Sequence, residues 1–230
     1  MPGEAKARND ARHPEQEEFA VIFDDVAAEA IRAFHDRTVR EGNWGRNDRP
    51  EFESGPWRSI ERNHRCNVLL WGEEDQARRT DVADREIAAN KRAIDRYNQA
   101  RNDAIEQIDE CLLSRLEAVR RRGDARRNSE TAGSIIDRLS ILSLKIFHMG
   151  LQTERRDAGP EHIDACRARL ARLTEQRGDL MESLDALLRE AAAGTAWFKV
   201  YRQFKMYNDP TLNPYLYGKG GDPGSGGNKG

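Results

Sequence analysis

The sequence predicts an all-α protein, an elongated antiparallel helical bundle of about five main helices with a short C-terminal element. Apolar residues recur at helical spacing over long segments, and Gly, Pro and helix-capping residues separate these segments. One segment also has the alternating steps of three and four residues that are typical of a coiled-coil seam. With 34% charged and 37% hydrophobic residues, the 230-residue chain suits a single slender core.

The first helix is expected from about Glu17 to Arg40, where apolar residues recur at helical spacing. The stretch 41–59, EGNWGRNDRPEFESGPWRS, has Gly, Asn and Pro residues and no periodicity, which indicates a long loop. The second helix is expected over about Ile60 to Arg79. The third is expected over about Asp84 to Arg121, after the acidic, capping-type residues of TDVAD.

The fourth helix is expected to begin after the capping pair Asn128-Ser129 and to end at Gly150. The fifth is expected from Pro160 to about Ala193. It has the clearest seam in the chain, formed by Ile163, Cys166, Leu170, Leu173, Arg177, Leu180, Leu184, Leu187 and Ala191. Because the third helix repeats this register, two long helices are expected to pack antiparallel.

The remaining segments are the C-terminal element and the two chain ends. The segment TAWFKVYRQFKMYND, 195–209, fits a short helix and also a strand, and we favour the helix. Residues 1–16 are polar and residues 218–230 are rich in glycine, so both are expected to be disordered. Residues 17–217 are expected to form a single helical-bundle domain.

Composition narrows the classes of partner and the cellular location. A net charge of -2 and a pI near 6.3 give no global field for a nucleic acid. The N-terminal sequence lacks the apolar core of a signal peptide, and charged residues interrupt the most apolar stretch, so we expect a cytoplasmic protein without a membrane span. The three cysteines are far apart, without CxxC spacing, and are expected to be reduced thiols.

Polar residues form stripes on three of the expected helices. The stripe on the second helix is Asn67, Trp71, Glu74 and Arg78; that on the third is Lys91, Asp95, Asn98, Asn102 and Asp109; that on the fourth is Glu130, Ser134, Asp137, Arg138, Lys145 and His148. Each stripe alone is equally typical of a solvated helix face. If the stripes meet, they line a central polar cavity in which burial and charge pairing tune pKa values.

The candidate catalytic residues, acting as acid, base or metal ligand, are Asp137, His148 and Glu74. The candidate ligand-binding residues are Arg78, Lys91, Asp95, Asn98, Asn102, Lys145, Arg202 and Lys205. The last two lie in YRQFKMYNDPTLNP, which either clamps an anionic or sugar-like ligand or straps the bundle. The sequence leaves these two alternatives open.

Metal-binding motifs are incomplete. Glu61 and His64 form one ExxH pair, whereas a di-iron bundle needs two such pairs with further glutamates. An all-α, magnesium-dependent pyrophosphatase would have EExxE followed by ExxD, but Ala77 stands where the third acid of the first motif belongs. Glu74, Glu106 and Asp109 remain weak candidates for Mg²⁺. GxxxxGK[ST], GxGxxG and GxSxG do not occur.

Four strings of the sequence, NHRCNVLLWGEEDQARR, IDRYNQARNDAIEQID, ETAGSIIDRLSILSLKIFHMG and KVYRQFKMYNDPTLNP, resemble the bacterial family of uncharacterised proteins DUF4254. The resemblance covers about Phe19 to Tyr217. Members are often found beside glycosyltransferase genes, which implies a role in glycan or envelope-sugar metabolism. The strings coincide with the polar stripes.

Two functions from different classes are consistent with the sequence. The leading hypothesis is a small all-α enzyme that binds a phosphorylated or sugar-derived metabolite in a central polar cavity. The alternative is a non-enzymatic helical scaffold or partner protein, associated with a glycosyltransferase, whose charges face solvent or another chain. The alternative predicts a flat surface without a pocket.

Overall fold

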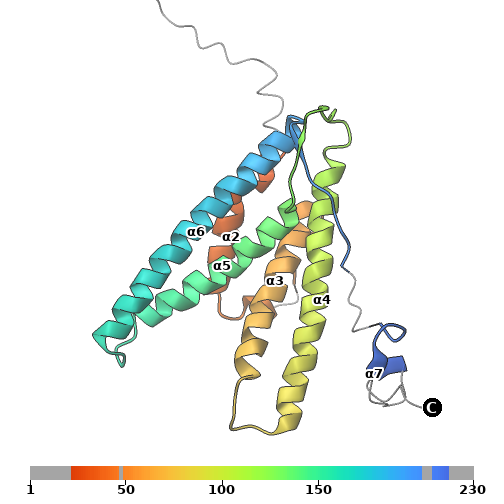
Figure 1. Cartoon of the computed structure of the whole chain (residues 1–230). Coiled ribbons are helices and arrows are strands. Elements are labelled where there is room, and N and C mark those ends of the chain that lie inside the picture. Colours follow the sequence, from red (N-terminus) through yellow and green to blue (C-terminus); the bar gives the residue numbers. More distant parts are fainter. Residues whose placement is uncertain (1–21, 47–48, 204–208, 218–230) are drawn as a thin grey trace, which may run out of the picture. The chain divides into compact units, whose positions relative to one another are not determined.

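A computed structural model of the chain describes residues 22–46, 49–203 and 209–217 (Figure 1). The predicted all-α class is confirmed. The helices are α2 (Ala28–Arg40), α3 (Gly55–Gln76), α4 (Asp84–Ser114), α5 (Ala132–Thr153), α6 (Pro160–Ala192) and the short α7 (Pro214–Tyr217). Two 3₁₀ turns, η1 (Asp24–Val26) and η2 (Trp44–Arg46), and a strand pair, β1 (Arg126–Arg127) and β2 (Ala196–Trp197), complete the described elements.

The chain divides into two compact units, residues 1–200 and 201–230, and α7 belongs to the second. The expected disordered ends, 1–16 and 218–230, lie outside the described residues. The single domain expected over 17–217 therefore stays a prediction. No helix in the described ranges is long and apolar enough to cross a membrane, and the three cysteines are free thiols.

Two helical hairpins form the first unit. α3 packs along α4, to which residues 77–83 connect it, and α5 packs along α6 after the connection 154–159. α2 lies against α5 and α6, and the two hairpins diverge toward their connecting turns (Figure 1). The prediction that the two long helices pack on each other is wrong, because α4 pairs with the shorter α3 and α6 pairs with the shorter α5. The predicted seam of α6 buries Cys166, Leu184 and Leu187.

All five long helices contribute to one hydrophobic core. Its centre contains one fully buried aliphatic side chain from each of them, namely Ile31, Ile60, Ile108, Ile136 and Leu184. Burial of such a side chain stabilises the fold by about 1.5 to 3 kcal/mol relative to leaving it exposed. The core therefore fixes the two hairpins against each other.

Several helix boundaries differ from the sequence expectation: α3 begins at Gly55, within the stretch 41–59 expected as a loop, and α5 ends at Thr153 rather than at Gly150. Two further boundaries differ for reasons that local patterns do not contain. α2 begins at Ala28, after η1, and its first N–H donates to Asp185 Oδ1 of α6 at 2.9 Å. A distant side chain thus satisfies an N-terminal N–H of the helix, which no nearby residue caps. α4 ends at Ser114, before a run of turns, rather than at Arg121.

The short helix expected after α6 is wrong for the described part of 195–209. Gly194, at φ +68°, ends α6, and the N–H groups of Gly194 and Thr195 donate back to Ala191 and Glu190 at 3.0 and 2.9 Å. This Schellman ending turns the chain so that β2 pairs in parallel with β1. Residues 204–208 lie outside the described residues.

Replacing Gly194 with alanine is expected to destabilise the fold by about 1 to 3 kcal/mol. Alanine strains the positive φ, and its Cβ would lie 2.5 Å from the carbonyl oxygen of Arg120. Urea unfolding measures the change. Gly178→Ala is the matched control, since Gly178 is an exposed helical residue of α6 with open space around it, and alanine there should stabilise by up to about 1 kcal/mol. Equal effects of the two substitutions would contradict the assigned helix ending.

Candidate functional site

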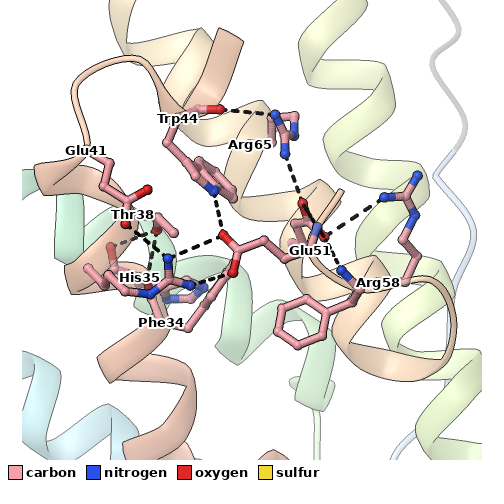
Figure 2. Close-up of polar contacts among 11 residues, drawn as sticks. Phe34, His35, Thr38, Glu41, Trp44, Glu51, Arg58 and Arg65 are labelled. Carbon is pink, nitrogen blue, oxygen red and sulfur yellow. Dashed lines mark hydrogen bonds and ion pairs between the residues drawn. The ribbon is translucent and has the colours of Figure 1, made fainter. Parts of the chain in front are cut away.

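The long loop before α3 is held by a buried carboxylate. Glu61 is 1% exposed and accepts hydrogen bonds from the backbone N–H groups of Glu51 and Phe52 at 3.1 Å and from Arg65 at 2.9 Å. Figure 2 shows the outer part of this arrangement, in which the Trp44 indole donates to Glu51 at 2.8 Å. The ExxH glutamate therefore anchors a loop.

The histidine of the same motif belongs to a buried ring pair. His64 stacks on His35 of α2 at 4.3 Å between ring centroids, and neither has exposed surface. His64 Nδ1 lies 2.7 Å from Ser140 Oγ, whereas its Nε2 and both ring nitrogens of His35 have no partner among the described residues. Burial lowers the pKa of His35 to about 3 and holds the pKa of His64 well below its usual range. Both rings are thus neutral at pH 7.

The predicted catalytic residue Asp137 lies where α3, α4 and α5 meet. Its Oδ1 accepts hydrogen bonds from the amide groups of Asn63 and Asn67 at 2.8 and 2.9 Å. Arg101 Nε of α4 lies 3.9 Å from the same oxygen. The Asn67 amide also donates to Ser140 at 2.9 Å, which connects this cluster to His64. We call these six residues the Asp137 network: Asn63, His64, Asn67, Arg101, Asp137 and Ser140.

Near the other ends of α3 and α5, Trp71 stacks on His148. The ring centroids are 4.5 Å apart and the planes differ by 4°. This pair borders a cleft of about 580 Å³ between α3, α5 and α6, which we call the Trp71 cleft. Its lining is Trp71, Asp75, Lys145, His148, Met149, Gln152, Arg169, Arg172, Leu173 and Gln176.

The Trp71 cleft has an excess of positive charge. Lys145, Arg169 and Arg172 have no ion-pair partner within the described ranges, whereas the nearby Arg167 pairs with Asp164 at 3.0 Å. Three cations around a concave surface create a local positive potential that attracts anions. Burial lowers the pKa of His148, against a smaller opposing effect of Asp75, so the imidazole in the cleft is neutral at pH 7.

A second cavity, of about 310 Å³, shares Trp71 and Asp75 with the first. We call it the Asn67 hollow. It is lined by Asn67, Leu70, Trp71, Glu74, Asp75, Arg78, Arg101, Ile141 and Leu144. Here the charges are balanced, because Arg78 pairs with Glu74 at 2.8 Å and Arg101 faces Asp137.

The structure brings some of the predicted residues together. Lys145 and His148 line the Trp71 cleft, and Glu74 and Arg78 line the Asn67 hollow. Asp137 is buried behind the hollow, against Asn67 and Arg101. It precedes His148 by eleven residues of α5, which is roughly 16 Å along a helix. These two groups therefore cannot act on one reacting atom.

Other predicted residues lie away from both cavities. Lys91 and Asp95 form an exposed ion pair at 3.7 Å. Asn98 is half-buried and Asn102 is buried, and neither lines a cavity described above. Arg202 belongs to the second unit, and Lys205 lies outside the described residues.

The three weak candidates for Mg²⁺ are not brought together. Asn90 of α4 donates to Glu73 at 2.6 Å, which places this part of α4 beside Glu74. Asp109 lies nineteen residues further along α4, or roughly 28 Å away, and Glu106 is on the same distant part of the helix. In the portion of the chain that is described, no group of three or more His, Cys, Asp or Glu residues could hold a metal ion.

Asp109 instead faces the start of α5. It is 1% exposed and accepts a hydrogen bond from the Gly133 N–H at 2.6 Å. A side chain at Gly133 would collide with Asp109 and with the carbonyl oxygen of Ile105, so glycine permits this close approach of α4 and α5. Burial raises the pKa of Asp109 to about 6.

Sequence reasoning did not find the two arginines of the Trp71 cleft or the serine of the Asp137 network. Arg169 and Arg172 lie three residues apart beside Leu173, a residue of the predicted seam. This spacing beside the seam was the only hint in the sequence that the two arginines border a cleft. It does not single them out, because α6 has many exposed arginines with similar neighbours. Ser140 lies between apolar residues of α5, and only its contacts with His64 and Asn67 distinguish it.

Comparison with known proteins gives one finding. A family model described as "Protein of unknown function (DUF4254)" matches residues 57–200. The matched range contains α4, α5, α6 and all residues that line the two cavities. No curated protein and no solved structure matches the chain.

The first prediction from these contacts concerns acid stability. His35 stays neutral in the folded protein down to about pH 3 but gains a proton near pH 6.5 when unfolded, so stability falls as pH decreases below 6.5. The variant His35→Leu lacks this imidazole, so the loss of stability that comes from protonation of His35 in the unfolded chain is absent. The unfolding free energy of the variant relative to wild type should rise by about 2 kcal/mol from pH 7 to pH 5. His162→Leu, at an exposed site, should show no such trend, and a pH-independent effect of His35→Leu would refute the neutral buried pair.

Asp109 leads to a prediction of opposite sign. Its pKa of about 6 in the fold exceeds the ordinary value of 3.8, so its contribution is fully present below pH 4 and is lost as pH rises through 6. Asp109→Asn does not titrate and should gain about 2 kcal/mol relative to wild type between pH 4 and pH 7. Chemical unfolding at several pH values measures this difference. Asp95→Asn, exposed on the same helix, serves as control. A constant difference for Asp109→Asn would rule out the raised pKa.

Proposed function

The chain belongs to the DUF4254 family, and from this premise we propose that the protein binds a small phosphorylated metabolite in the Trp71 cleft. The observation that carries the proposal is the convergence of Lys145, Arg169 and Arg172 on one cavity without a described ion-pair partner. Arginine binds phosphate through two parallel hydrogen bonds, and lysine adds a point charge. A bound phosphoryl group would be the negatively charged partner of these three side chains.

The aromatic pair supports a ligand larger than a bare anion. The cleft volume of about 580 Å³ falls within the range of small-molecule sites, roughly 300 to 1,000 Å³. Such sites combine apolar walls with a few polar groups, and here Trp71, Met149 and Leu173 provide the apolar walls. The proposed ligand therefore has an organic part that lies against the ring pair.

His148 is the group through which the site would act as an enzyme. Its imidazole is neutral at pH 7 and borders the cleft beside Asp75, so it can accept a proton from a bound ligand. Asp137 does not reach this cleft, and its role in the proposal is positioning, because it holds Asn67 one helical turn from Trp71. Glu74 belongs to the neighbouring Asn67 hollow.

The alternative function is a helical scaffold associated with a glycosyltransferase. That function requires a surface for another protein and no cavity. The two adjacent cavities, together with the unpaired cations that line the larger one, favour the binding of a small molecule. The cytoplasmic location stays part of the proposal.

Inorganic phosphate should bind and stabilise the protein. At 100 times its dissociation constant, a ligand of the native state adds about 2.7 kcal/mol to the unfolding free energy. Arg172→Gln should weaken phosphate binding by about tenfold or more, because it removes a charge-assisted hydrogen bond. Isothermal titration calorimetry at constant ionic strength, with chloride as the balancing anion, measures both constants.

Arg167→Gln is the matched control for this experiment. It removes the same charge from the same helix, but Arg167 pairs with Asp164 and does not line the cleft. Its phosphate affinity should equal that of wild type. If Arg167→Gln and Arg172→Gln weaken binding equally, phosphate responds to the general charge of α6, and the proposed site is wrong.

A further inference from the structure

The Asn67 hollow adjoins the proposed phosphate site. Trp71 and Asp75 line both cavities, so the two cavities adjoin at these side chains. The two cavities nevertheless differ in charge. This difference indicates which part of a ligand each of them accepts.

Charge in the hollow is compensated by ion pairs. Glu74 neutralises Arg78 at 2.8 Å, and Asp137 faces Arg101 at 3.9 Å. A second anionic group in the hollow would approach Glu74 and Asp75, and a cationic group would approach Arg78 and Arg101. Because the charges of the lining compensate each other, the hollow favours neither an anionic nor a cationic group, and a neutral part of a ligand suits it best.

The hydrogen-bonding groups of the hollow include both donors and acceptors. Arg101 lines the hollow and makes no hydrogen bond within the described ranges; its Nε is buried, and the two terminal nitrogens of its guanidinium are the N–H donors that a ligand could use. Both hydrogens of the Asn67 amide are taken by Asp137 and Ser140, so its carbonyl oxygen is the group left for a ligand. The Glu74 carboxylate, 45% exposed, adds acceptors.

A hydroxyl group matches this inventory because it donates one hydrogen bond and accepts others. An apolar group would leave Arg101 and Asn67 without partners, which costs affinity. The apolar residues Leu70, Ile141 and Leu144, together with Trp71, offer surface for the carbon skeleton between hydroxyls.

We infer that the Asn67 hollow binds the hydroxyl-rich, neutral part of the same ligand whose phosphoryl group occupies the Trp71 cleft. The ligand class is a sugar phosphate that extends across Trp71, with Glu74 and Arg101 as specificity-determining residues. This inference rests on the proposed phosphate site and adds the chemistry of the remainder of the molecule.

The test compares inorganic phosphate with a panel of pentose and hexose monophosphates by calorimetry at constant ionic strength. At least one sugar phosphate should bind wild type about tenfold or more tightly than phosphate does. Glu74→Gln should remove that gain and leave the affinity for inorganic phosphate unchanged, and Arg101→Met should also remove the gain. Because Glu74 is largely solvated, Glu74→Gln should fold normally, and it keeps the test valid if Arg101→Met does not fold.

Glu130→Gln is the matched control, since Glu130 also pairs with an exposed arginine, Arg138, but lies outside both cavities. It should change neither affinity. If phosphate binds through Arg172 but no sugar phosphate binds more tightly, or if Glu74→Gln keeps the gain, the hollow is not a sugar subsite, although the phosphate site stands. If neither phosphate nor any sugar phosphate binds, the proposed function fails and this inference fails with it.

Discussion

The hydrogen bonds to the buried carboxylate of Asp137 join the two helical hairpins at a single group. Two amides from α3 donate to one of its oxygens, and Arg101 of α4 lies opposite, so three helices meet at one charged group. Removing one partner of such a group leaves a buried charge uncompensated, which typically costs about 3 to 5 kcal/mol. Asn67 and Trp71 are four residues apart on one face of α3, and Asp137 and His148 share a face of α5. The Asp137 network and the stacked pair at the cleft thus lie along the same faces of α3 and α5.

Three buried acids in this protein have structural rather than chemical roles. Glu61 holds the loop before α3, Asp109 faces the start of α5, and Asp137 joins three helices. Each is satisfied by N–H donors, which is the condition for burying a carboxylate at tolerable cost. By contrast, the groups that line the two cavities include cations, a neutral imidazole and the acids Glu74 and Asp75. Positive charge is in excess at the Trp71 cleft alone of these two cavities, and this excess supports the proposal of an anion there.

Periodicity predicted much of the fold, because the helices α3 to α6 bury residues at regular intervals, and Pro160 and Gly194 mark the start and the end of α6. Helical spacing also placed Asn67, Trp71, Glu74 and Arg78 on one face, which the Asn67 hollow confirms. Periodicity cannot tell an inward stripe from an outward one, and so Lys91 and Asp95 are solvated. Contacts between distant residues, such as the cap of α2 by Asp185 and the pairing of β1 with β2, leave no local signal in the sequence. Arg169 and Arg172 were missed for the same reason, since only the fold places them opposite Trp71.

The chain has four tryptophans, at positions 44, 57, 71 and 197, and their indole N–H signals report on separate places in the molecule. Recording these signals by nuclear magnetic resonance during titration with inorganic phosphate tests the central claim most directly, with Trp71→Phe to assign the signal at the cleft. If the anion binds among Lys145, Arg169 and Arg172, the Trp71 signal should shift and saturate while the other three stay in place. Trp197 lies under Arg121 at 4.4 Å and reports on a different cationic region. A saturating shift of the Trp197 signal with Trp71 unmoved would contradict the assignment of the Trp71 cleft as the anion site.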